Sequence, residues 1–138
     1  MVIEAINLLA LVGAVFVYMV IGFLWYSPVL FAKPWMKLMG YTPESMKEAQ
    51  NEMGTLYLLS ALGALVTAFV LAQLFKWLLP DTLNLALGIS FMIWVGFIAP
   101  VQFTEVLFGK KQMNLFLINT GYQLSGILAM GAVIFYLA

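Results

Sequence analysis

The side chains of this sequence that could bind a ligand are few, and most of them lie inside or beside long apolar segments. They are hydroxyls, phenols, amides and one carboxylate: Ser27, Tyr57, Ser60, Gln102, Glu105, Asn119, Tyr122 and Gln123. Gathered at one end of a helical bundle, such groups could line a polar cavity for a small molecule or a lipid. Their alternative role is to hydrogen-bond one helix to the next, as hydroxyls and amides commonly do in membranes.

Several residue types that enzymes use are missing. The chain has no His and no Cys, and all six of its basic residues are Lys. It therefore lacks the usual proton shuttle, the thiol nucleophile and the thiolate metal ligand. No two carboxylates are placed to act as an acid–base pair. We expect no enzyme, no cofactor and no metal site, and a net charge of zero without a basic stripe predicts no nucleic-acid binding.

Glu105 is the strongest single candidate for a functional residue, because an ionisable group inside a membrane span usually has a function. It lies five residues before Lys110, close to the end of its apolar segment. An ion pair with Lys33 or Lys111 is the structural alternative.

The composition decides which solvent surrounds these groups. Of 138 residues, 64% are hydrophobic and 9% are charged, and the mean hydropathy is +1.04. Soluble domains are about 45–50% apolar and about 25% charged. A chain of this length cannot bury so much apolar surface in its own core. We therefore expect a single integral membrane domain that covers residues 1–138.

Four apolar segments are long enough to cross about 30 Å of hydrocarbon as helices. They run from about 8 to 31, 55 to 78, 83 to 108 and 114 to 137. Backbone polar groups in lipid must be satisfied within the segment, which favours helices over strands. The predicted fold is an all-α membrane protein with four transmembrane helices.

The connection between the first two spans predicts a short cytoplasmic amphipathic helix. Thr42, Pro43 and Glu44 provide an N-cap, a first-turn proline and a first-turn acid. Met39 and Gly40 resemble the end of a preceding helical turn. The helix either lies at the membrane surface or is a solvated entry to the second span.

The two halves of the chain, about 1–78 and 83–138, resemble one another. Thr55, Tyr57 and Ser60 align without gaps with Thr120, Tyr122 and Ser125, and Pro28 aligns with Pro100. A duplicated hairpin would give a pseudo-two-fold axis along the membrane normal, and chance similarity of apolar segments is the alternative. Both prolines are predicted to kink their helices.

Small residues predict where the helices touch, because close backbone approach drives packing in lipid. They recur at four-residue spacing in the second and fourth spans: Ser60, Ala64, Ala68 and Ala72, and Gly121, Ser125 and Ala129. We expect these two spans to be tightly packed, with each other or across a subunit interface.

The run from Gly22 to Gly40, with its Trp25-Tyr26-Ser27-Pro28 element, is the most distinctive part of the chain. Together with Pro100 and the Asn119–Tyr122 stretch, it resembles a family of small bacterial membrane proteins catalogued as domain of unknown function 1761. The resemblance implies a four-helix protein of the bacterial cytoplasmic membrane. It carries no established activity, so it transfers no functional residue.

Two functions remain open at this point. The first is a transporter-like or channel-like protein with a polar cavity open to the cytoplasm; a channel would need a homo-oligomer, because four helices leave little room for a pore. The alternative is a non-transporting scaffold, or a lipid- or protein-interaction module, held by interhelical polar contacts. The expected partners are the lipid bilayer, a possible small-molecule or lipid ligand, and further copies of the chain.

The lysine distribution predicts the orientation, because cytoplasmic connections are enriched in Lys and Arg. Lys33, Lys37, Lys47 and the pair at 110–111 lie on one side, and Lys76 lies on the other. Both termini should therefore be outside. In intact cells, a Lys47→Cys variant should resist an impermeant maleimide, and an Asp81→Cys variant should react. Labelling at position 47 from the outside would overturn the assignment.

Overall fold

The computed structural model describes residues 2–109 and 112–138, and in these residues the chain is helical with no strand. Four helical stretches are long and apolar enough to cross a membrane, as the sequence predicts. These are α1 (Leu8–Trp25), α4 (Met53–Leu78), the stretch Leu83–Gly109, and α7 (Met113–Leu137). The third stretch consists of α5 (Leu83–Ile93), the π-helical η1 (Trp94–Ile98) and α6 (Ala99–Gly109). The chain is therefore a multi-pass membrane protein.

Two short helices join α1 to α4, namely α2 (Ala32–Met39) and α3 (Pro43–Gln50). The N-cap Thr42 accepts a hydrogen bond from the Ser45 backbone N–H, and the Ser45 hydroxyl accepts one from the Thr42 backbone N–H. Gly40 ends α2 in the left-handed region, at φ 77°, where a side chain would be strained. The helix start at Thr42 and the helix end at Gly40 are therefore as the sequence predicts.

The first span is shorter than predicted, because α1 ends at Trp25 and not near Phe31. A tight turn follows, in which the Phe31 N–H donates to the Trp25 carbonyl at 3.0 Å. The Ser27 hydroxyl donates to the Leu24 carbonyl at 2.7 Å and so satisfies one of the last helical acceptors. The interpretation of Pro28 as a kink within a helix is thereby corrected. Pro28 lies in the turn, where its missing N–H costs no helical hydrogen bond.

Pro100 lies inside the third span, near the start of α6, and the helical stretch continues through it. Its missing N–H leaves the Gly96 carbonyl without its usual helical donor. The preceding turn is π-helical, and the Ala99 N–H donates to the Trp94 carbonyl five residues earlier. Local π geometry of this kind lets a membrane helix contain a proline. The two aligned prolines thus have different local structures, and the two-fold relation between the hairpins remains a prediction.

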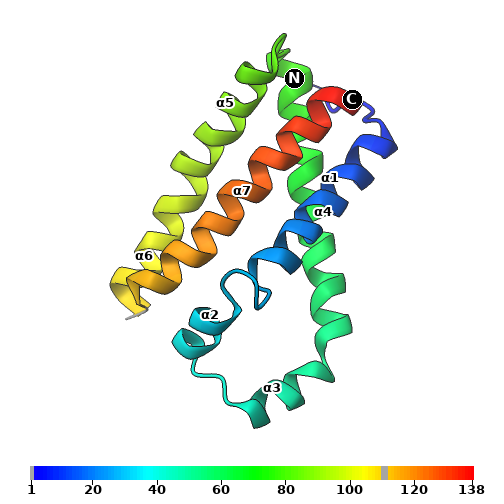
Figure 1. The fold of residues 1–138 in the computed structure, drawn as a ribbon. Helices are drawn as coiled ribbons and strands as arrows, with labels where there is room; N and C mark the ends of the chain where they lie inside the picture. The colour runs from blue at the N-terminus through cyan, green and yellow to red at the C-terminus, as the bar shows by residue number, and fades with distance from the viewer. Residues whose placement is uncertain (1, 110–111) are drawn as a thin grey trace.

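Helix α7 lies between α5–α6 on one side and α1 with α4 on the other (Figure 1). Its main neighbour is α1, which approaches it closely at glycines. A Cβ on Gly13 would lie 3.1 Å from the Val133 side chain, and a Cβ on Gly126 would lie 2.5 Å from the Tyr18 ring. Small residues thus permit the contact between α1 and α7, as packing in lipid requires.

The small-residue stripe of α4 is only partly used. Ala64, Ala68 and Ala72 are buried, whereas Ser60 is exposed. α4 packs mainly against α1 and less extensively against α7. The part of α4 before Ala64 diverges from the other long helices toward α3, and nearly all of its side chains are exposed (Figure 1). The predicted close packing of α4 with α7 is therefore wrong within one chain, because α1 is the main neighbour of both helices, and packing across a subunit interface stays a prediction.

Both chain ends lie at the same end of the bundle, opposite α2 and α3 (Figure 1). The buried Gln73 side chain accepts from the Glu4 N–H at 3.0 Å and donates to the Glu4 carbonyl at 2.6 Å. Asn7 caps α1 and also donates to the Leu137 carbonyl at 2.9 Å. These bonds fasten the residues before α1 to the ends of α4 and α7. We call this end of the molecule the termini end.

The close contact at Gly126 gives a stability prediction. Gly126→Ala should lower the free energy of unfolding by about 1–3 kcal/mol, because the methyl group would overlap a tyrosine ring that is already packed. Gly63 is the matched control, since a Cβ there meets nothing within 4 Å. Gly63→Ala should be neutral or stabilise by up to about 1 kcal/mol through helix propensity. Equal unfolding free energies for the two variants in detergent would contradict this packing.

Candidate functional site

The polar side chains of α7 meet those of α6 in a short hydrogen-bonded chain. The Gln102 amide N–H donates to the Gln123 side-chain oxygen. The buried Thr120 hydroxyl donates to the Gln102 side-chain oxygen at 2.7 Å. Gln102 thus uses both ends of its amide to bind α7. We call Gln102, Thr120 and Gln123 the amide cluster.

A second set of hydrogen bonds joins α7 to the end of α1. The Tyr26 hydroxyl donates to the Asn119 side-chain oxygen at 2.7 Å, and the Trp25 indole N–H donates to the Ile118 carbonyl at 2.9 Å. One turn away, the Tyr122 hydroxyl donates to the Tyr18 carbonyl at 3.2 Å. Asn119 and Tyr122 therefore hold α1, while their neighbours on α7 hold α6.

An indole ties the π-helical turn to the same part of α7. The Trp94 indole N–H donates to the Thr120 carbonyl at 3.0 Å. Thr120 is thereby bound twice, through its hydroxyl and through its backbone. In the described part of the chain, no buried side-chain nitrogen or oxygen is left without a partner. The buried polar side-chain atoms in this half of the bundle are therefore satisfied by protein atoms.

Aromatic rings surround the contact between α1 and α7. The Tyr122 ring lies 4.9 Å from the Tyr18 ring and 5.5 Å, edge-on, from the Tyr26 ring, measured between centroids. Tyr26 also meets Trp35 of α2 at 5.4 Å. Burial raises the pKa of the Tyr26 hydroxyl, which lies one residue beyond α1, above its usual value. At neutral pH this hydroxyl is protonated and remains a donor to Asn119.

The eight residues proposed from the sequence do not line one space. Four of them, Gln102, Asn119, Tyr122 and Gln123, make the interhelical hydrogen bonds described above. The remaining four lie elsewhere: Ser27 bonds within its own turn, Tyr57 packs on Phe23 with ring centroids 5.0 Å apart, and Ser60 and Glu105 are exposed. This is the arrangement that interhelical bonding predicts. An ion pair between Glu105 and Lys111 lies outside the described residues.

The divergence of α4 explains why Tyr57 and Ser60 are absent from the cluster. Both belong to the first half of α4, which diverges from α7 toward α3 (Figure 1), and Tyr57 packs there on Phe23 of α1. The residue pattern did not indicate that Trp25 and Trp94 would donate to backbone carbonyls. The three-residue spacing of Thr120 and Gln123, which places them on one helical face, could have indicated that they share a partner.

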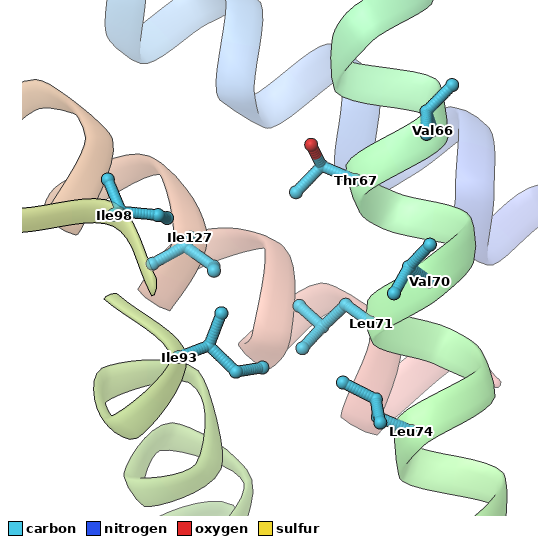
Figure 2. Close-up of a pocket in the computed structure, with 8 residues that line it drawn as sticks. All are labelled: Val66, Thr67, Val70, Leu71, Leu74, Ile93, Ile98 and Ile127. Carbon is cyan, nitrogen blue, oxygen red and sulfur yellow. The ribbon is translucent and has the colours of Figure 1, made fainter. Parts of the chain in front are cut away.

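An apolar groove lies between the second half of α4 and the α5–η1–α6 helix (Figure 2). Its volume is about 280 Å³. The lining residues are Val66, Thr67, Val70, Leu71 and Leu74 of α4, Ile93 and Ile98 across the gap, and Ile127 of α7 at its floor. The Thr67 hydroxyl, the one polar side-chain group among them, donates to the Gly63 carbonyl of its own helix at 3.2 Å. The groove therefore presents a hydrocarbon surface.

In residues 2–109 and 112–138, no three Asp or Glu side chains come together as a metal site would require. The groove has no charged lining residue. The groove therefore offers almost only apolar contacts.

The chain belongs to the family described as protein of unknown function DUF1761, whose model matches residues 9–135. The match covers all four membrane-spanning stretches apart from their outermost residues. Neither the curated proteins nor the solved structures include a significant match. The family assignment thus agrees with the resemblance of the Gly22–Gly40 run and leaves the activity to be argued from the site.

Proposed function

We propose that this DUF1761 protein is a non-transporting membrane module that binds a lipid acyl chain in the groove between α4 and α5–η1–α6. The observation that carries the proposal is the apolar groove itself. It lies along membrane-spanning helices and is lined by hydrocarbon on both walls and at its floor. Inside a bilayer, the surrounding solvent is made of acyl chains, so an acyl chain is the natural occupant.

The size of the lining side chains favours an acyl chain over another helix. Helices that associate in membranes use small residues, which let the backbones approach. The groove is instead lined mostly by branched residues such as Val70, Ile93 and Ile98. A thin, flexible chain can follow the gaps between such side chains, whereas a helix would be kept at a distance.

One end of the groove is closed by close packing of three helices. A Cβ on Gly131 of α7 would lie 2.2 Å from the Ser90 hydroxyl of α5 and 3.6 Å from the Phe75 ring of α4. Beyond the groove toward the termini end, these three residues bring α4, α5 and α7 together. An acyl chain in the groove would therefore be bounded on that side.

The polar network supports the non-transporting part of the proposal. A solute pathway needs polar groups that a passing ligand can reach. In the amide cluster, these groups are hydrogen-bonded to one another between α6 and α7. Asn119 and Tyr122 are likewise bonded to α1. We further propose a location in the bacterial cytoplasmic membrane with both termini outside and no catalytic role. Homo-oligomerisation is not required for this function and remains a prediction from the sequence.

The groove is tested by filling it. Val70→Phe should occupy the space of an acyl chain, so the purified protein should retain about one phosphatidylcholine fewer per chain in native mass spectrometry. Val12→Phe is the matched control, because Val12 is 56% exposed on α1, Val70 is 51% exposed, and only Val70 lines the groove. The control should keep the lipid of the unmodified protein.

Two results would contradict the proposal. One is equal lipid retention by the unmodified protein and the Val70→Phe variant. The other is saturable solute uptake by vesicles that contain the purified protein, when that uptake is lost on Gln102→Leu but kept on Val70→Phe. That second result would restore the transporter interpretation.

A further inference from the structure

We propose that α2 lies in the membrane–water interface and binds the phosphate groups of anionic phospholipids through Lys33 and Lys37. This site lies away from the groove and uses none of its residues. It extends the proposed lipid-binding function from the acyl chain to the headgroup. The argument rests on where α2 is held, how its two faces differ, and where the basic charge of the connection is concentrated.

The first step is the position of α2 along the bundle. Its first residue, Ala32, is buried, and α2 packs against α7. The Tyr26–Asn119 and Trp25–Ile118 hydrogen bonds fix the preceding turn to the first part of α7. α2 is therefore held beside the last residue of α1 and the first part of α7, and we place it at the boundary between hydrocarbon and headgroups.

The second step is the difference between the two faces of α2. Trp35, on the face that packs, is half-buried, with its ring 5.4 Å from Tyr26 and 5.3 Å from Tyr41, between centroids. Lys33 and Lys37 are exposed and four residues apart, so they lie one turn apart on the same side of the helix. Aromatic rings beside lysines are typical of segments at the membrane interface.

The basic charge of the connection between α1 and α4 is concentrated on α2. Lys33 and Lys37 are the only charged residues of α2, whereas α3 carries Glu44 and Glu48 against one lysine, Lys47. Neither lysine of α2 makes an ion pair within the described part of the chain. The cationic surface of the connection is thus confined to α2, and α3 would be repelled by an anionic membrane surface.

An anionic lipid suits this surface better than an acidic protein does. The two ammonium groups stand beside the aromatic residues that anchor the helix at the interface, so headgroup phosphates lie within their reach. The positive-inside pattern predicts that this end faces the cytoplasm, where the leaflet is rich in anionic lipids. Basic residues next to a membrane helix are attracted to such a surface, each by about a fivefold change in affinity.

The test measures headgroup choice while the acyl chains are kept identical. Purified protein is equilibrated with equimolar phosphatidylglycerol and phosphatidylcholine, and native mass spectrometry counts the lipids of each kind that stay bound. The unmodified protein should retain an excess of phosphatidylglycerol. Lys33→Gln combined with Lys37→Gln should reduce this excess about tenfold or more, from the loss of two basic groups.

The matched control is Lys47→Gln combined with Lys76→Gln, which removes the same charge from α3 and from the termini end. It should keep the excess of phosphatidylglycerol. Equal losses in the two double variants would show that net charge alone attracts the lipid, and would overturn the assignment to α2. An unmodified protein without any excess would also overturn it and would leave an acidic protein partner as the explanation for the lysines.

Two further measurements keep the test decisive. If the α2 double variant does not fold, the salt dependence of lipid binding by the unmodified protein tests the proposal. Its excess of bound phosphatidylglycerol must fall as the salt concentration is raised. A salt-independent excess contradicts the proposal. Val70→Phe separates the two sites: loss of the groove lipid should leave the headgroup excess unchanged, and failure of the headgroup test would leave groove binding untouched.

Discussion

The fold depends on one constraint, which is that a polar group in hydrocarbon must find its partner inside the protein. Helix α7 carries four polar side chains that form hydrogen bonds to other segments, and these bonds point in two directions. Asn119 and Tyr122 bind α1, while Thr120 and Gln123 bind Gln102 of α6. Because these bonds lie in the same half of the bundle, they fix α1 and α6 to α7 there. The close glycine contacts of α1 with α7 extend the same arrangement toward the termini end.

The position of α4 depends on which of its two halves makes polar contacts. Its first half makes no polar contact to α7 among the described hydrogen bonds. Tyr57 packs there on Phe23 of α1, and the fully buried residues of α4 begin at Ala64. Buried Gln73 instead binds Glu4 at the termini end. α4 is therefore fastened at one end and diverges at the other. The groove lies beside the second half of α4, where its lining side chains are almost all apolar.

The sequence predicted the features that depend on local chemistry. Apolar length identified the four spans, and the N-cap at Thr42 and the glycine at position 40 marked the ends of short helices. It overestimated the first span, because apolar residues continue past Trp25 although a turn with Pro28 ends the helix. The presence of a proline did not reveal that Pro28 lies in a turn whereas Pro100 lies inside a helical stretch, where a π-helical segment accommodates it. The pairing of Gln102 with Gln123, and the divergence of α4, depend on contacts between distant segments that residue spacing does not specify.

We propose that the polar residues of α7 hold helices together and do not serve a solute. Thr120→Val and Thr104→Val each delete one hydroxyl, but the Thr120 hydroxyl binds across to Gln102 and the Thr104 hydroxyl binds the Pro100 carbonyl of its own helix. The measurement is the free energy of unfolding of both variants in the same lipid–detergent mixture. Thr120→Val should lose about 0.5–2 kcal/mol, since Gln102 is left with an unused acceptor, and Thr104→Val should change little. Equal unfolding free energies for the two variants would contradict the account.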